Sequence, residues 1–220
     1  MSIREKFDEG LNRIDAMLKE LGDIAIESVN AAMESVDKLD AEKAKVAINN
    51  DPRAYTLMRS IEKECTEIIM LQAPVAKDLR KLITSMKISV DLDRIVRYAR
   101  NISQLSQEMI EEKEKHFKKL IGLKEMNRIT SGMIENSMNA LLVGDRSLAI
   151  KVFEEEKDVD ALYEQIFREL ITYMVEDNRK ITRGVRYLLV GRYLERIADH
   201  ACNIAEGSVY IMTGERVTMD

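Results

Sequence analysis

The segment DLDRIVRYARNI, from Asp91 to Ile102, is repeated near the end of the chain as YLERIADHACNI, from Tyr193 to Ile204. The two copies lie 102 residues apart. Identical pairs include Arg94 and Arg196, Ile95 and Ile197, Ala99 and Ala201, Asn101 and Asn203, and Ile102 and Ile204. A second match upstream pairs Asp40 with Asp145 at a spacing of 105 residues. Self-similarity over such a distance indicates that the chain duplicates one structural unit.

Helical periodicity fills the first copy. From Phe7 to Leu39, apolar or small side chains recur at alternating intervals of four and three, which is typical of a coiled-coil-like contact face. We expect one helix from the third residue through this seam, and a second helix capped by Asp40. The sequence NNDP, Asn49 to Pro52, is expected to kink or split the second helix, because proline is favoured at a helix start. A third helix is expected from about Val75 to the charged segment 111–119.

The same pattern then starts again. A helix is expected from Leu120 to Val143, with Gly144 ending it and Asp145 capping the next helix. That helix should continue to about Glu176, and after a short turn the last helix should extend to about Thr213. No alternation of β-branched residues competes with this interpretation.

Six helices in two sets of three predict an all-α fold, with two homologous three-helix bundles in tandem over residues 1–114 and 115–220. The composition agrees, because only two prolines and nine glycines occur and 45% of the residues are hydrophobic. The chain carries 34 basic and 39 acidic residues, a net charge of −5. A nucleic-acid-binding protein usually has a basic surplus, so this balance argues against nucleic acid as a partner.

The chain shows no sign of membrane insertion or secretion. Its longest mainly apolar uncharged stretch, IIMLQAPVA (68–76), is half of what a bilayer span requires. The amino terminus is charged from its fourth residue and lacks the apolar core of a signal peptide. Cys65 and Cys202 have no spacing typical of a disulfide framework or zinc site. These features predict a cytoplasmic protein with two buried thiols.

Two acid pairs in the second copy are the main candidate for chemistry. Glu156 and Asp160 lie one turn apart on the fifth expected helix, and Glu195 and Asp199 are spaced in the same way on the sixth. Like charges at this spacing destabilise a helix unless something offsets them. If the two helices pack side by side, four carboxylates converge, and such oxygen-rich clusters suit cations such as magnesium, manganese or iron.

The residues alone leave a second interpretation open. Arg192 precedes Glu195 by three residues and Arg196 precedes Asp199 by three, so both acids would form ion pairs on a solvated helix face. Three further residues are secondary candidates for the cluster: Asp158, His200 and Glu206.

A family resemblance bears on this choice. LERIADHACNIAE (194–206), followed by VYIMTGE (209–215), resembles the carboxyl-terminal signature of PhoU-type phosphate-uptake regulators. APVAKDLR (73–80) and DLDRI (91–95) resemble the amino-terminal repeat of that family, and DVDALYEQIFREL (158–170) resembles its fifth helix. The resemblance spans essentially the whole chain. It implies a cytoplasmic protein of two three-helix bundles that represses phosphate uptake and starvation signalling when phosphate is ample.

The resemblance also implies partners and a metal. The expected partners are the ATPase subunit of a phosphate ABC transporter and a phosphate-sensing histidine kinase, so contact with the membrane complex is peripheral. Some family members bind multinuclear iron or other metals through acid-x-x-x-acid motifs. We therefore expect a metal, iron first with manganese, zinc or magnesium as alternatives, at Glu156, Asp160, Glu195 and Asp199, and no organic cofactor.

The first copy departs from this pattern. In the repeat alignment Asp51 matches Glu156, but Tyr55 takes the place of Asp160. Likewise Asp93 matches Glu195, but arginine 97 takes the place of Asp199. An arginine keeps its charge in a protein and would repel a cation. The sequence therefore predicts a metal site on the second bundle only.

Alternative functions are a di-iron storage protein or oxidase, and a helical adaptor without ligand. Di-iron bundles usually carry Glu-x-x-His motifs. The residue three positions before His116 is Lys113, and the one three positions before His200 is Ile197, so neither histidine belongs to such a motif. We expect His116 to be an exposed loop residue. No nucleophile–base pair, glycine-rich phosphate loop or P-loop lysine is present, so we predict neither an enzyme nor direct phosphate binding. The long seam of the first helix would also allow a homodimer.

Overall fold

The computed structural model describes residues 3–113 and 115–216 of the 220-residue chain. This part contains six long α-helices and one short 3-10 turn, with no strand. The helices are α1 (Ile3–Lys38), α2 (Ala41–Gln72), α3 (Ala76–Glu111), α4 (Ile121–Val143), α5 (Arg146–Glu176) and α6 (Ile181–Thr213), and the turn is η1 (Asn178–Lys180). The predicted all-α fold is confirmed. Glu114, at the predicted division into 1–114 and 115–220, lies outside the described residues, as do both ends of the chain.

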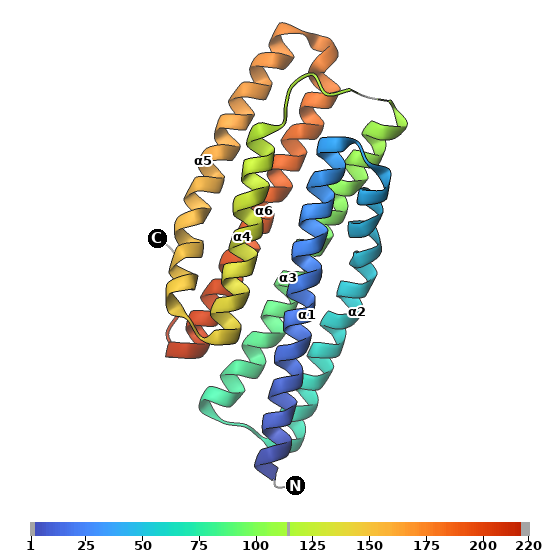
Figure 1. Cartoon of the computed structure of the whole chain (residues 1–220). Helices are drawn as coiled ribbons and strands as arrows, with labels where there is room; N and C mark the ends of the chain where they lie inside the picture. Colours follow the sequence, from blue (N-terminus) through green and yellow to red (C-terminus); the bar gives the residue numbers. More distant parts are fainter. Residues whose placement is uncertain (1–2, 114, 217–220) are drawn as a thin grey trace.

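Two three-helix bundles lie side by side along their length (Figure 1). α1, α2 and α3 pack together, and α4, α5 and α6 form the second set. The bundles meet where α3 contacts α6 and α1 contacts α4. Their buried side chains form one hydrophobic cluster that crosses this boundary. None of the helices in the described ranges combines the length and apolar character needed to cross a bilayer.

The helix ends follow local sequence chemistry. Asp40 caps α2 through its Oδ1, which accepts the backbone N–H groups of Glu42 (2.8 Å) and Lys43 (3.2 Å). Asp145 caps α5 in the same way, as predicted. Gly144 ends α4 with φ of 77°, a left-handed conformation that costs little without a β-carbon.

The seam of α1 is buried as its spacing predicts. Ile14, Leu18 and Leu21 are completely inaccessible to solvent. In the second half of the seam, the buried Ser28 and Ser35 donate their hydroxyl groups to backbone carbonyls of their own helix. These small residues therefore allow close packing without leaving a polar atom unpaired.

The predicted split of α2 is wrong. The helix runs continuously through Pro52, although a proline inside a helix costs about 3 kcal/mol. Contacts to the other two helices hold this turn. The amide of the buried Asn50 donates to Glu27 and Ser28 of α1, each at 3.1 Å. On the other side, Asp51 accepts from Arg100 of α3 at 2.8 Å, so tertiary contacts outweigh the local signal.

Polar contacts also fasten the two bundles to each other. His200 of α6 is hydrogen-bonded through Nδ1 to Oδ1 of Asp91 on α3, at 2.8 Å. Asn203 donates to the same oxygen at 3.2 Å, and the rings of Tyr98 and Tyr193 pack 5.8 Å apart. The repeated segments that define the duplication thus lie against each other in the fold.

Candidate functional site

The acidic residues of the second bundle are positioned by the close antiparallel packing of α5 and α6. Two glycines of α6 permit this approach. A β-carbon added at Gly184 would lie 2.8 Å from Met174, and one added at Gly191 would lie 3.0 Å from Tyr163. The buried apolar residues of both helices face the core, and the acids fall along the outer face that the two helices share.

The four predicted ligands have different neighbours on this face. Burial raises the pKa of Glu156, and the nearby Asp160, Asp199 and Glu206 raise it further. Burial and Asp199 also raise the pKa of Asp160, while Arg192 acts in the opposite direction. Asp160, Asp199 and Glu206, the last only a secondary candidate, thus all act electrostatically on Glu156.

Glu195 and Asp199 form the ion pairs that the alternative interpretation described. Arg192 contacts the Glu195 carboxylate directly, and Arg196 Nη1 lies 3.0 Å from Asp199 Oδ2. Glu195 also lies near Tyr163, whose pKa is raised by burial and then by this carboxylate. On α5, by contrast, neither acid of the pair forms an ion pair within the described residues.

The fit of a metal can be judged from the donors and their partners. Carboxylate oxygen is a suitable donor for hard and borderline divalent cations. In the described part of the chain, however, no three His, Cys, Asp or Glu side chains are placed so that they could hold a metal ion. The donor chemistry therefore fits a cation, whereas the ligand geometry would require Asp199 and Glu195 to leave their arginines.

The secondary candidates other than Glu206 lie elsewhere. Asp158 is exposed on α5, and His200 is hydrogen-bonded to Asp91 across the bundle seam. Glu206 itself carries a pKa raised by burial and then by Asp91. The acidic face therefore consists of five carboxylates: Glu156, Asp160, Glu195, Asp199 and Glu206.

In the first bundle, the acids at the matching positions form ion pairs with arginines of the same bundle. Arg97 donates to the buried Asp93 at 2.9 Å, and Arg100 donates to Asp51 at 2.8 Å. Burial raises the pKa of Asp93, Arg97 lowers it, and Asp51 raises it again. Tyr55, in place of the second acid, is exposed. Each of these two acids, Asp51 and Asp93, therefore already has its own guanidinium.

The repeat alignment shows how the two sites diverged. Arg100 of the first copy, which pairs with Asp51, matches the neutral Cys202 of the second. Cys202 is buried, and burial together with Glu156 and its neighbours raises the pKa of the thiol. The second copy thus has no arginine at the position that corresponds to Arg100, and Glu156 forms no ion pair among the described residues.

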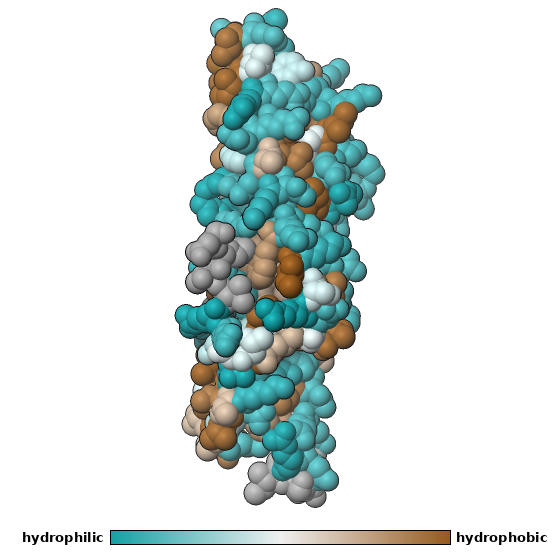
Figure 2. All heavy atoms as spheres, turned by 90° about the vertical axis from the view of Figure 1, so that its left-hand side faces the viewer, coloured by the Kyte–Doolittle hydropathy of each residue, from teal (hydrophilic) through white to brown (hydrophobic). Residues whose placement is uncertain are grey.

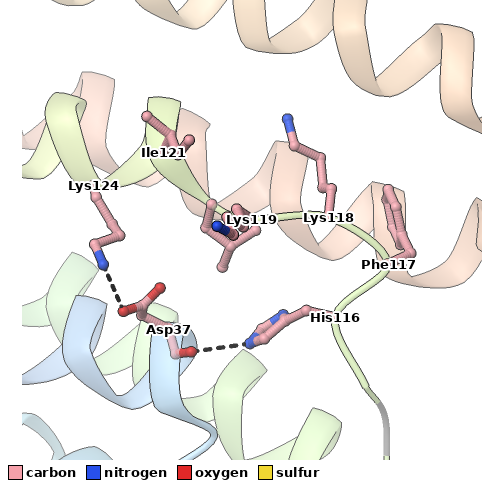
Figure 3. Close-up of a pocket in the computed structure, with 8 residues that line it drawn as sticks. Asp37, His116, Phe117, Lys118, Lys119, Ile121 and Lys124 are labelled. Atoms are coloured by element: carbon pink, nitrogen blue, oxygen red, sulfur yellow. Dashed lines mark hydrogen bonds and ion pairs between the residues drawn. The ribbon is translucent and has the colours of Figure 1, made fainter.

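A separate cavity of about 490 Å³ lies where the link between the bundles meets α1 and α4 (Figure 3). Lys124 donates to the Asp37 carboxylate at 2.9 Å, and Lys118 is paired with Glu169. His116, expected as an exposed loop residue, is instead half-buried. Its Nδ1 is hydrogen-bonded to the Tyr187 hydroxyl (2.6 Å) and its Nε2 to the backbone oxygen of Asp37 (3.2 Å). The lining cations are mostly paired, so we assign no ligand to this cavity.

These features define a class of duplicated helical-bundle proteins in which one copy carries a paired-acid face. The chain belongs to the PhoU family, since the PhoU domain matches it twice, at residues 18–106 and 123–207.

Whole-chain relatives agree with this assignment. A phosphate-specific transport system accessory protein PhoU homolog from Clostridium acetobutylicum is 32% identical over 218 residues, which cover 99% of each chain. A protein of the same description from Xylella fastidiosa is 32% identical over 98% of this chain and 90% of its own.

Two solved structures share the fold. The crystal structure of PhoU from Pseudomonas aeruginosa superposes with a TM-score of 0.91 at 31% identity, covering 95% of this chain and all of that one. The phosphate transport system regulatory protein PhoU from Streptococcus pneumoniae has a TM-score of 0.87 at 27% identity, covering 97% of this chain and all of that one.

Proposed function

We propose that this protein is a regulatory accessory protein of a phosphate transport system and represses phosphate uptake when phosphate is ample. The observation that carries the proposal is the match of both bundles, in order and over nearly the whole chain, to phosphate-specific transport accessory proteins. A role limited to one shared domain would not account for similarity over both bundles.

The proposed mechanism is protein–protein contact in the cytoplasm. The partners are the ATPase subunit of the phosphate ABC transporter and a phosphate-sensing histidine kinase, and the protein has no catalytic reaction of its own. Long rigid helices support this role, because they present extended charged surfaces to partners. Both histidines are engaged in contacts between bundles or with the link, which favours an adaptor over a di-iron oxidase.

Phosphate uptake by cells with and without the gene tests this proposal. Deletion should raise uptake at ample phosphate, and the wild-type gene should restore repression. The tagged protein should also co-purify with the transporter ATPase and the kinase in a manner that depends on phosphate. Unchanged uptake in the deletion strain would reject the regulatory role.

A second proposed activity is cation binding by the acidic face. It is supported by three carboxylates of this face: burial, Asp160 and Asp199 raise the pKa of Glu156, and burial and Asp199 raise the pKa of Asp160. Binding would exchange two arginine contacts for metal–oxygen contacts. Substitution of Glu195 and Asp199 by alanine should lower the content of iron, manganese or zinc in protein purified without chelator. Unchanged metal content in this double variant would exclude the assignment.

A further inference from the structure

The outer face shared by α5 and α6 carries an exposed apolar stripe above the acidic residues. Its six side chains are between 39% and 82% exposed. They are Phe167, Ile171 and Val175 of α5 and Ile181, Val185 and Leu189 of α6. Each set is spaced by four residues, so it follows one side of its helix. Figure 2, viewed from the α5 side, shows a column of hydrophobic side chains near the upper end of the molecule, with further apolar patches lower down.

The stripe and the acidic residues share one face. Phe167 follows Asp160 by seven residues, two helical turns, and Val185 precedes Asp199 by fourteen, four turns. The packing of Gly184 against Met174 sets the two helices in register, so the stripes of α5 and α6 lie next to each other.

The charge along this face is uneven. The part of the face away from the apolar stripe holds five carboxylates, of which only Asp160 is exposed, against three cations. Those cations are Arg192, Arg196 and Lys157. The surplus is negative, and it begins where the apolar stripe ends. A binding partner for the whole face therefore needs apolar side chains at one end and basic side chains at the other.

We propose that the α5–α6 face is a docking surface for an amphipathic helix of a partner protein, apolar along one side and basic at one end. From Val175 to Glu156 the face extends 19 residues, about 28 Å at 1.5 Å per residue. A helix of about 20 residues covers this length. Helices that bind in this way use anchors at intervals of three and four residues, which matches the spacing of the stripe.

The first bundle provides an internal comparison. At the spacing of 105 residues, Phe167 and Ile171 correspond to Glu62 and Thr66. Val175 corresponds to Met70, which is also apolar and exposed, so the first copy keeps one of the three α5 stripe positions and has polar residues at the other two. This docking role does not depend on the proposed regulation of phosphate transport.

The test uses a fluorescent 20-residue helical peptide with leucines at intervals of three and four and lysines at one end. A control peptide keeps the leucines and replaces every lysine by glutamate. Anisotropy is measured in EDTA, so that no divalent cation occupies the carboxylates. The basic peptide should bind and lose affinity as salt rises, and the acidic peptide should bind at least about tenfold more weakly. Equal binding of the two peptides would overturn the proposal.

Protein variants locate the contact. Ile171→Ser with Val185→Ser should weaken peptide binding about tenfold or more, and Glu156→Gln with Asp160→Asn should remove most of its salt dependence. The matched control is Met70→Ser with Leu71→Ser near the end of α2. These two apolar side chains are also exposed, by 76% and 82%, but they do not belong to the acidic face. Circular dichroism checks that all variants fold.

Three results would refute the docking role. The first is unchanged peptide affinity in the Ile171→Ser, Val185→Ser variant. The second is dissociation of a wild-type dimer by that variant in sedimentation, which would make the face a contact between copies of this chain. The third is stripe-dependent binding to phosphatidylglycerol vesicles in place of the basic peptide.

Discussion

Replacing Arg97 by alanine should destabilise the first bundle, because it removes the cation paired with a buried carboxylate. The Asp93 side chain is only 4% exposed and lies 2.9 Å from Arg97, whose own side chain is 37% exposed. Breaking a fully buried pair costs about 3–5 kcal/mol, and solvent at Arg97 reduces this to about 2 kcal/mol. In a chain of this size, that loss lowers the Tm by about 4–8 °C. Thermal unfolding followed by circular dichroism measures the shift.

Arg196→Ala is the matched control in the second copy. Its pair with Asp199 has side chains 46% and 37% exposed, so the loss should stay below about 1 kcal/mol.

The pH dependence of stability gives a second check on the role of Arg97. The pKa of Asp93 is raised by burial, so its ionised form costs stability once the pH rises through that pKa. Without Arg97 this cost grows, and the deficit should be large at neutral pH and shrink towards about pH 4. Equal, pH-independent deficits for Arg97→Ala and Arg196→Ala would refute the reasoning.

The acidic face and the glycine contacts give further predictions. The pKa values of Glu156 and Asp160 are raised, so the contribution of these acids to stability should fall as the pH rises through those values. The Tm of the wild type, measured in EDTA from about pH 4 to 8, should therefore decrease with pH. The variant Glu156→Gln with Asp160→Asn should show a weaker dependence of Tm on pH. A slope that persists in this variant would exclude these acids as its source. Gly184→Ala should cost about 1–3 kcal/mol in urea unfolding, because the new methyl group meets Met174 at 2.8 Å. Gly132→Ala meets nothing within 4 Å and should instead stabilise α4 by about 0.5–1 kcal/mol; equal effects of the two would contradict the packing.

Most of the fold could be predicted because its signals are local and repeated. The seam beginning at Phe7 and the caps at Asp40 and Asp145 each depend on neighbouring residues only. The predicted split at Pro52 was wrong because contacts from Asn50 and Asp51 to other helices offset the free-energy cost of the proline. The pattern of a single helix does not contain these contacts. His116 was misjudged for the same reason, since its partners are Tyr187 and Asp37 from distant segments.

The site was predictable in part. Spacing alone placed the acids on shared helix faces, and the repeat identified Arg97 as a cation at a ligand position. The difference between Arg100 and Cys202 was also visible in the aligned copies, so the second copy has no arginine at the position that pairs with Asp51 in the first. Spacing could not decide that Glu206 would join the cluster, because this depends on how α6 lies against α5 and α3.

The proposal that is central to this account is that the acidic face of the second copy binds a divalent cation, whereas Arg97 and Arg100 neutralise the matching acids of the first copy. Equilibrium dialysis against Mn²⁺, with the bound metal counted by mass spectrometry, tests it most directly. We predict binding to the wild type that is lost in Glu156→Gln with Asp160→Asn and retained in Asp51→Asn with Asp93→Asn. Retention in the former variant, or loss in the latter, would contradict the claim.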